Sequence, residues 1–174
     1  MHANSNSLVE ALERLLRISQ LKDAGKMARS KRRLWTCLKC GARFVTRNIY
    51  HGCGAFSVRK FLAGKGPRAR RFYKKFYALV KRCGPVSVAP TKTRVAFMVR
   101  VRFAGVNRIS NRGMTASFAL PRRLDSPRIQ RVEHPVRRWY VHYFRVSSPE
   151  ELDDEALEWL RESYRMGEQR HLES

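Results

Sequence analysis

Hydrophobic positions near the amino terminus recur at the spacing of a helix. The apolar residues that share one helical face there are Leu8, Leu12, Leu15 and Leu16. Ser7 and Glu10 have the spacing of a capping box, in which a hydroxyl and a carboxylate bond to the first free amides of a helix. The pattern predicts a helix that ends near Gly25, followed by a basic linker over residues 26–33 without apolar periodicity.

Two further helices are predicted before the middle of the chain. Ser57 can cap a short helix over Val58–Ala63, and Pro67 begins a longer helix after two glycines. The apolar face of the longer helix carries Phe72, Phe76, Leu79, Val80 and Cys83. Its opposite, basic face carries Arg70, Lys74 and Lys81. Gly84 and Pro85 are expected to end this helix.

The region that follows alternates between apolar and polar residues, as strands do. The alternation is strict from Arg94 to Phe103, which predicts one half-buried strand with arginines on its outer side. A hairpin turn is expected over Asn111–Gly113. Further strands are predicted over Met114–Leu120, Arg128–Glu133 and Tyr140–Val146.

A last helix is predicted near the carboxyl terminus. Ser148, Pro149 and Glu151 supply an N-cap, a first-position proline and a capping carboxylate. The apolar face of this helix carries Leu152, Leu157, Leu160 and Tyr164.

This order of elements predicts an α+β fold, in which helices flank an antiparallel sheet of four to five strands and a small cysteine-rich module precedes the sheet. The expected organisation is a helical extension at 1–26, a basic linker and zinc module at 27–56, the α+β domain at 57–167 and a tail at 168–174. Met27 could itself be a start, so the first helix is expected to be an extension that the rest of the fold does not need.

The chain is strongly basic, and its charge is unevenly distributed. The chain carries 37 basic and 14 acidic residues, a formal net charge of +23. Residues 55–146 have a net charge of +21, whereas residues 147–174 have a net charge of −6. A field of this sign attracts polyanions, nucleic acid before an anionic membrane surface.

No apolar stretch approaches the roughly 20 residues of a membrane span. The amino terminus lacks the pattern of a secretory signal, so we expect a cytoplasmic protein, whose cysteines more often bind metal than form disulfides.

Three of the four cysteines lie within nineteen residues. Cys37 and Cys40 form a C-x-x-C pair, whose spacing lets a tight turn place two thiolates on one tetrahedral zinc ion. Cys53 is the expected third ligand and His51 the expected fourth, provided that the chain bends around Gly52. The rival fourth ligands are Cys83, His134 and His142. Four protein ligands would close the coordination sphere, so the expected zinc is structural rather than catalytic.

Two basic surfaces could bind nucleic acid. One is the outer face of the longer helix, with Arg70, Lys74 and Lys81. The other is the outer face of the sheet, whose expected contacts are Lys92, Arg94, Arg100 and Arg102. Tyr73, Tyr77 and Tyr143 are candidates for stacking on bases.

Several segments together resemble a known family. They are WTCLKCGARFVTRNIYHGCG, CGPVSVAPTKTRVAFMVRVRFAG, LPRRLDSPRIQRVEH and SPEELDDEALEWLRESYRMG. The set resembles DUF5655, a bacterial domain family of unknown function, from about Leu34 to Gly167, while CLKCGARF resembles the opening of a zinc finger or zinc ribbon. The resemblance implies a small α+β domain without an established activity or catalytic residue. Related domains occur beside restriction-type DNA proteins, which gives slight weight to nucleic acid.

Three functions remain open at this point. The favoured one is a zinc-stabilised basic protein that binds DNA or RNA through phosphate contacts, with little sequence selectivity. The first alternative is a regulatory or protein-interaction module in which the acidic tail docks on a basic body. The second is a metal-dependent, nuclease-like enzyme that would use Lys92, Asp125, Glu133 and His142. These residues do not have the spacing of a recognised nuclease core, so the sequence favours a binding protein over an enzyme.

Overall fold

The computed structural model of the chain describes residues 34–169 except for 42, 45–46 and 49–50. The chain divides into two units, residues 1–33 and residues 34–174, and the second is described below. The predicted first helix and basic linker lie outside the described residues, and so does most of the predicted tail.

The described residues form a two-stranded hairpin and a six-stranded sheet. In the hairpin, β1 (Trp35–Thr36) pairs antiparallel with β2 (Arg43–Phe44). The strands of the sheet are β3 (Ser87–Pro90), β4 (Val95–Met98), β5 (Arg102–Ser110), β6 (Gly113–Leu120), β7 (Ile129–Val136) and β8 (Trp139–Val146). Their order is β3-β4-β5-β6-β8-β7, and all neighbours are antiparallel. The α+β class is confirmed, with six strands in place of the four to five expected.

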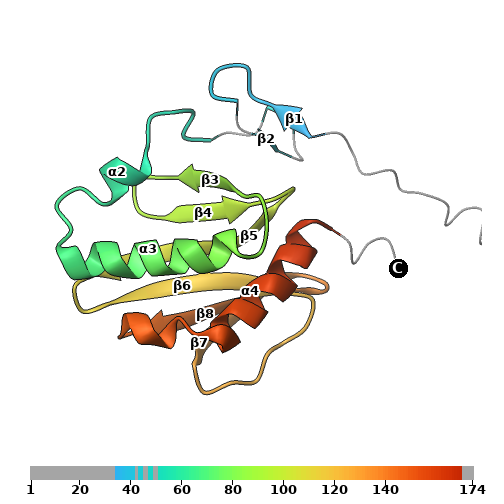
Figure 1. The fold of residues 1–174 in the computed structure, drawn as a ribbon. Coiled ribbons are helices and arrows are strands. Elements are labelled where there is room, and N and C mark those ends of the chain that lie inside the picture. The colour runs from blue at the N-terminus through green and yellow to red at the C-terminus, as the bar shows by residue number, and fades with distance from the viewer. Residues whose placement is uncertain (1–33, 42, 45–46, 49–50, 170–174) are drawn as a thin grey trace, which may run out of the picture. The chain divides into compact units, whose positions relative to one another are not determined.

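The two long helices lie on one face of the sheet. The helices of the described residues are α2 (Val58–Phe61), α3 (Pro67–Lys81), the 3₁₀ helix η1 (Pro149–Glu151) and α4 (Asp154–Gly167). Figure 1 shows α3 and α4 lying across the same side of the strands. The predicted cap of α2 is confirmed, since the Ser57 hydroxyl accepts a hydrogen bond from the amide of Lys60 at 3.1 Å.

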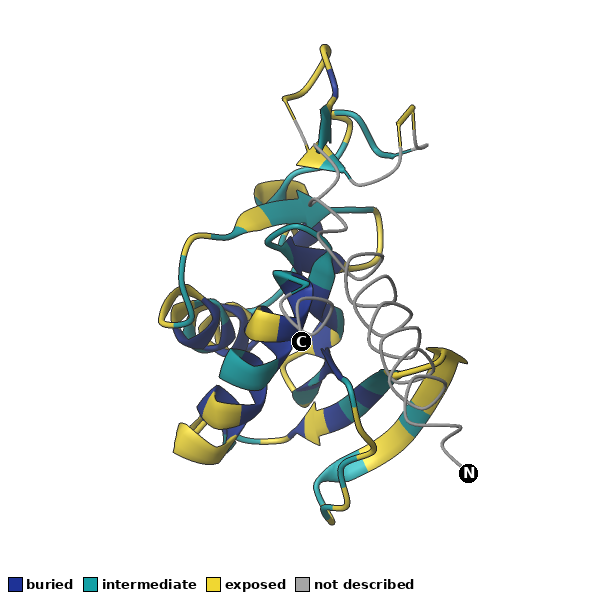
Figure 2. Cartoon of the chain, turned by 90° about the vertical axis from the view of Figure 1, so that its right-hand side faces the viewer, coloured by how far each residue is buried: buried dark blue, intermediate teal, exposed yellow. Residues whose placement is uncertain are grey.

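The hydrophobic core lies between these helices and the sheet. Phe76 of α3 packs against Phe97 of β4 and Phe144 of β8, with ring centroids 5.8 and 6.4 Å apart. Trp159 of α4 stacks on Phe118 of β6 at 5.3 Å. The buried residues in Figure 2 therefore concentrate in the helices and the inner strands.

The predicted single strand from Arg94 to Phe103 is wrong, because the structure folds this stretch into a β4–β5 hairpin. The turn residues Val99 and Val101 are apolar, so the alternation continues through the turn without marking it. The turn lies beside the end of α4: the amide of Val101 donates to the carbonyl of Gly167 at 3.1 Å, and Cγ1 of Val99 lies next to Gly167. The strand over β3 was not predicted.

The start of the last helix also differs from the prediction. Ser148, Pro149 and Glu151 do form a capping box, but it caps η1 rather than α4. Asp153 caps α4, since its side chain accepts a hydrogen bond from the amide of Ala156 at 3.0 Å.

The strand register divides the side chains between two faces. Phe118 lies opposite His142 on the face that packs against α3 and α4. Ser117 lies opposite Tyr143 and Gly105, and these residues belong to the other face. Among the described residues neither long helix packs on that side, which is called the open face below.

Candidate functional site

The C-x-x-C segment forms a tight turn. The amide of Gly41 donates to the carbonyl of Cys37 at 2.8 Å, and Gly41 has φ of +71°, a conformation that a side chain disfavours. Leu38 at the tip is fully exposed, whereas the Cys37 side chain is buried. The turn therefore directs the two thiols to the same side.

The bend expected near Gly52 is present. Cys53 and Gly54 both have positive φ, 29° and 80°, and the amide of Ala55 donates to the carbonyl of Gly52 at 2.7 Å. This turn brings the thiol of Cys53 back toward the ring of His51, although an extended chain would separate them.

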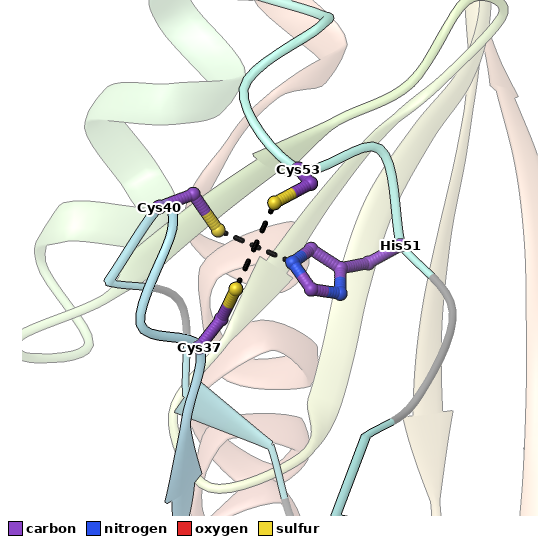
Figure 3. Close-up of side chains that lie close together, drawn as sticks. All are labelled: Cys37, Cys40, His51 and Cys53. Carbon is purple, nitrogen blue, oxygen red and sulfur yellow. Dashed lines mark hydrogen bonds between the residues drawn. The ribbon is translucent and has the colours of Figure 1, made fainter.

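The four predicted ligands converge (Figure 3). Their ligand atoms all lie within 4.8 Å of one another. The sulfurs of Cys37 and Cys53 are 3.7 Å apart, and the sulfur of Cys40 is 3.2 Å from Nε2 of His51. A tetrahedral zinc ion with Zn–S bonds of about 2.3 Å separates its ligand atoms by roughly 3.5–3.8 Å. The group thus fits a zinc site, and the 3.7 Å separation excludes a disulfide bond, which needs about 2.05 Å.

The rival fourth ligands lie elsewhere. Cys83 donates to the carbonyl of Leu79 at 3.5 Å. His134 stacks on Tyr140 at 4.1 Å, and His142 is buried against Phe118. The geometry therefore favours His51 as the fourth member of the cluster.

Aromatic contacts fix the imidazole within the hairpin. The ring of His51 lies 4.7 Å from that of Phe44 and 6.2 Å from that of Trp35. Trp35 and Phe44 are cross-strand partners whose rings stack at 6.1 Å. β1 and β2 thus supply a small apolar support on which the histidine is oriented.

The thiols differ in acidity when no metal is bound. The backbone amide of Cys40, with that of Lys39, lowers the pKa of the Cys37 thiol to about 6. Burial raises the pKa of Cys53 to about 11, and its hydrogen bond with Cys37 acts in the same direction. A divalent cation displaces such protons when thiolates bind it. Three thiolates and one imidazole would leave no position for a reactive water, so this donor set suits a structural ion.

Acidic side chains concentrate around η1 and α4, where they form ion pairs with basic residues. Glu150 pairs with Arg71 of α3 at 3.2 Å, and Asp154 with Arg82 at 3.8 Å. Three more pairs link this region to the chain around β7: Arg122–Glu162 at 2.8 Å, Arg128–Asp153 at 3.1 Å and Arg128–Glu155 at 2.5 Å. The carboxyl-terminal segment thus neutralises part of the positive charge on the helical side.

The helix-face candidates are exposed, as predicted. Arg70, Lys74 and Lys81 all point to solvent. The tyrosines of the same helix do not, because Tyr73 is buried and Tyr77 stacks on Phe97 at 5.8 Å. These two tyrosines are part of the core packing, whereas Tyr143 lies on the open face.

The sheet-face candidates are only partly brought together. Lys92 and Arg94 line a first hollow of about 850 Å³ on the open face, together with Lys65, Arg108, Arg131 and Tyr143. Arg94 and Arg102 line a second hollow of about 480 Å³, with Glu133, Trp139, Val141 and Tyr143. Arg100 does not belong to this surface, because its guanidinium donates to the side chain of Gln169 at 3.1 Å. Its position in the β4–β5 turn, which the sequence did not mark, explains the difference.

Arg102 is held across the surface of the sheet. Its Nη2 donates to Oδ1 of Asn107 at 3.4 Å, and Nδ2 of Asn107 donates to the hydroxyl of Ser117 at 2.9 Å. A Cβ at Gly105 would lie only 2.8 Å from Nη2, so the guanidinium occupies the space that a side chain there would fill. Burial lowers the pKa of Arg102, and the charge of Arg94 acts in the same direction. Among the described residues Arg102 has no carboxylate partner.

The open face contains functional candidates that the sequence reasoning missed. They are Lys65, Asn107, Arg108, Arg131 and Trp139. Asn107 and Arg108 follow the unrecognised turn, and a bulge between Val106 and Arg108 shifts their register. Trp139 could have been found, because strict alternation along β8 places it on the same face as Tyr143, which the sequence analysis did name.

The proposed nuclease-like cluster does not assemble. Glu133 lies opposite Val141 on the open face, whereas His142 is fully buried on the helix side. Glu133 is occupied by Arg131 at 3.0 Å and by the hydroxyl of Tyr143 at 2.8 Å. Lys92 lines the first hollow, and neither hollow includes Asp125. In the described part of the chain, the cysteine–histidine group is the only cluster of three or more potential metal ligands.

The fold and the site define a small α+β domain preceded by a Cys3His hairpin. The family model for "Domain of unknown function (DUF5655)" matches residues 58–167, well over half of the chain, and the chain therefore belongs to this family. The hairpin precedes the matched region. Comparison with curated proteins and with solved structures found no match. Within the described residues, no helix is long and apolar enough to cross a membrane.

Proposed function

We propose that this protein is a zinc-stabilised nucleic-acid-binding protein that contacts phosphates through the open face of its sheet. The observation that carries the proposal is the set of cations on that face without acidic partners. Lys92, Arg94, Arg102 and Arg108 form no ion pair with a described residue. Of the described residues that line the two hollows, Glu133 is the one carboxylate, and it pairs with Arg131.

The distribution of acids supports the open face over the helix face. Glu150 and Asp154 compensate Arg71 and Arg82 beside the outer side of α3, so a polyanion there meets negative charge as well. The interaction-module alternative, in which the acidic tail docks on a basic body, also expects pairs of this kind within the chain, so the pairs do not separate it from the proposal.

The metal has a supporting role in this proposal. Zinc bound by Cys37, Cys40, His51 and Cys53 would hold a hairpin that has only two residues in each strand. Strands this short cannot supply a core of their own, and small modules of this kind commonly depend on a metal ion.

Salt-dependent binding tests the proposal. Affinity for a fluorescently labelled oligonucleotide, measured by anisotropy from about 50 mM salt upward, should fall linearly on a log–log plot, by about 0.9 per phosphate contact on duplex DNA. Replacing both Arg94 and Arg102 by Gln should lower the slope by up to about two.

The matched control replaces Lys74 and Lys81 by Gln, which removes the same charge from the helix face. A loss of slope in this control, with none in the sheet-face variant, would assign binding to the helix. Absence of binding to DNA and RNA at about 50 mM salt would reject the proposed function. Cleavage of the probe in Mg²⁺ would support the enzyme alternative.

A further inference from the structure

The first hollow of the open face collects positive charge from three separate segments. They are the loop between α2 and α3, the turn between β3 and β4, and β5, and the cations that they contribute are Lys65, Lys92, Arg94 and Arg108. None of the four forms an ion pair with a described residue. Of the described residues that line this hollow, none is a carboxylate. Its volume of about 850 Å³ is that of a site for a small organic ligand.

Two β-bulges add polar side chains to this hollow. In β5 one extra residue, Asn107, interrupts the register with β6, and Asn107 and Arg108 both line the hollow. In β7 the extra residue is Gln130, which interrupts the register with β8, and Gln130 and Arg131 both line the hollow. Regular alternation would turn one residue of each pair toward the helix side of the sheet. Bulges change the direction of a side chain in this way, and they are frequent beside functional sites.

The backbone and one wall of the hollow are held by contacts within the chain. The amide and the hydroxyl of Thr91 donate to the carbonyl of Arg94 at 2.8 and 3.1 Å, and the amide of Arg94 donates to the Thr91 hydroxyl at 3.2 Å. These bonds close the turn that carries Lys92. Across the hollow, the guanidinium of Arg131 lies over the ring of Tyr143, 4.2 Å from its centroid. A site that is ordered before the ligand arrives loses less entropy on binding.

The concentration of charge favours a phosphate monoester over an internal phosphodiester. An internal phosphate of a nucleic acid carries one negative charge, whereas a terminal phosphate carries about −1.5 to −2 at pH 7 and has three strong acceptor oxygens. The hydroxyl of Thr115 and the amide of Gln130 supply further donors in the same hollow. Four cations without acidic partners therefore interact more strongly with the terminal group.

We infer that the first hollow binds the terminal phosphate monoester of a nucleic-acid strand. The inference rests on the proposed function and specifies which part of the ligand occupies this hollow. Arg94 lines both hollows, so the strand would continue past it toward Arg102 in the second hollow. A mononucleotide carries the same phosphate group, and the experiment therefore includes one as a competitor.

The test uses a short, internally labelled DNA strand in three forms, with a 5′ phosphate, with a 3′ phosphate and with neither. At low salt, anisotropy should show that a phosphorylated form binds about tenfold more tightly than the unphosphorylated form, the gain from one hydrogen bond to a charged group. An unphosphorylated strand that is one nucleotide longer adds charge without a monoester and should not reproduce this gain. Arg108→Gln should bring the affinity ratio of the two forms close to one.

Arg145→Gln is the matched control. Arg108 and Arg145 are both exposed and are cross-strand partners of Thr115, from β5 and β8, but Arg145 lines neither the first nor the second hollow. Its removal should weaken binding of all three forms alike and leave their ratio unchanged. Lys92→Gln changes an exposed turn residue and should lower the ratio as Arg108→Gln does, which keeps the test valid if Arg108→Gln folds poorly. Thermal midpoints report the folding of each variant.

The competitor distinguishes two sources of the phosphate group. Displacement of the phosphorylated strand by adenosine monophosphate, but not by adenosine, would show that the monoester alone is sufficient. Preference for the phosphorylated strand without such displacement would show that the adjoining strand is also required, and both results support the inference. Equal affinity for the three forms, or an equal loss of the ratio in Arg145→Gln and Arg108→Gln, would overturn the inference while the protein still binds nucleic acid. Absence of binding to all forms would overturn the proposed function as well.

Discussion

Replacement of Gly105 by Ala tests whether the position of Arg102, rather than its charge alone, matters for binding. The new Cβ would lie 2.8 Å from Nη2 of Arg102 and 3.0 Å from the carbonyl oxygen of Val95. Ordinary contacts begin near 3.4 Å, so the guanidinium must move by at least about 0.6 Å. Gly105 does not have a positive φ, and the backbone itself accepts alanine without strain.

The expected magnitudes follow from these contacts. Overpacking lowers the free energy of unfolding by about 1–3 kcal/mol, whereas the smaller conformational entropy of alanine in the unfolded chain raises it by about 0.4–1 kcal/mol. The guanidinium of Arg102 can move away from the new methyl group, but the backbone carbonyl of Val95 cannot. We therefore expect the free energy of unfolding to fall by about 1 kcal/mol and the thermal midpoint by roughly 3 °C. Weakening one charge-assisted hydrogen bond by about 1 kcal/mol should reduce oligonucleotide affinity roughly fivefold.

Anisotropy titrations and thermal unfolding measure both quantities. Because Gly105→Ala keeps every charge, its salt slope should equal that of the unmodified protein, in contrast to Arg102→Gln. The matched control is Val80→Ala, which creates a small cavity in the α3 packing, costs comparable stability and leaves the open face untouched. In the double variant with Arg102→Gln, the effect of Gly105→Ala on affinity should disappear, since the two residues act through the same contact.

The reasoning would be refuted if Gly105→Ala lowered the thermal midpoint while the affinity stayed unchanged. That result would mean that the orientation of Arg102 over the sheet has no part in binding. Equal affinity losses in Gly105→Ala and Val80→Ala would also refute it, because they would trace the loss to stability.

Three further predictions concern other parts of the molecule. Elemental analysis of protein purified under reducing conditions should find about one zinc ion per chain. Cys40→Ser should abolish zinc binding and His51→Ala should reduce it. Protein that contains no metal would contradict the predicted zinc site. Burial, with the charges of Arg122 and Arg123, lowers the pKa of His142 below 6.5 despite the opposing charge of Glu162. Between pH 6.5 and the lower pKa of the folded state, only the unfolded chain binds a proton at His142. The contribution of His142 to the free energy of unfolding should therefore be complete above pH 6.5 and should fall by up to about 1.4 kcal/mol per pH unit as the pH drops toward the folded-state pKa. Chemical denaturation at several pH values should show this loss, and His142→Gln, which keeps an acceptor for the amide of Leu124, should reduce it. Ser163 accepts from the amide of Ala119 at 3.0 Å and donates to the carbonyl of Phe103 at 2.6 Å. Ser163→Ala should therefore destabilise the fold by about 2–3 kcal/mol in the same assay, and a loss below about 0.5 kcal/mol would show that neither group depends on the hydroxyl.

The sequence predicted the structure correctly where a short motif, such as a helix cap or a metal-ligand spacing, determines the local conformation. Ser57 predicted the cap of α2, and Pro67 marked the start of α3. The spacing of Cys37, Cys40, His51 and Cys53 predicted a cluster that the structure brings together. Each of these features depends on residues within a short stretch of chain, so no long-range packing had to be known.

The prediction failed where a tertiary contact decided the local structure. Val99 and Val101 alternate with arginines like strand residues, yet they form a turn because the end of α4 binds the amide of Val101. This error also misplaced Arg100, which was grouped with Arg102 although its side chain contacts Gln169. Nothing local reveals that contact, since the two residues are 69 positions apart.

The asymmetry of charge in this fold follows from the order of its elements. The acidic carboxyl-terminal segment forms η1 and α4, and α4 covers the same face of the sheet as α3. Its carboxylates therefore reach Arg71, Arg82, Arg122 and Arg128 but line neither hollow of the open face. A segment with a net charge of −6 thus neutralises one side of a strongly basic domain and leaves the other positive. Because attraction of a polyanion depends on local rather than total charge, this arrangement supports the proposal that nucleic acid binds on the open face rather than on the helical side.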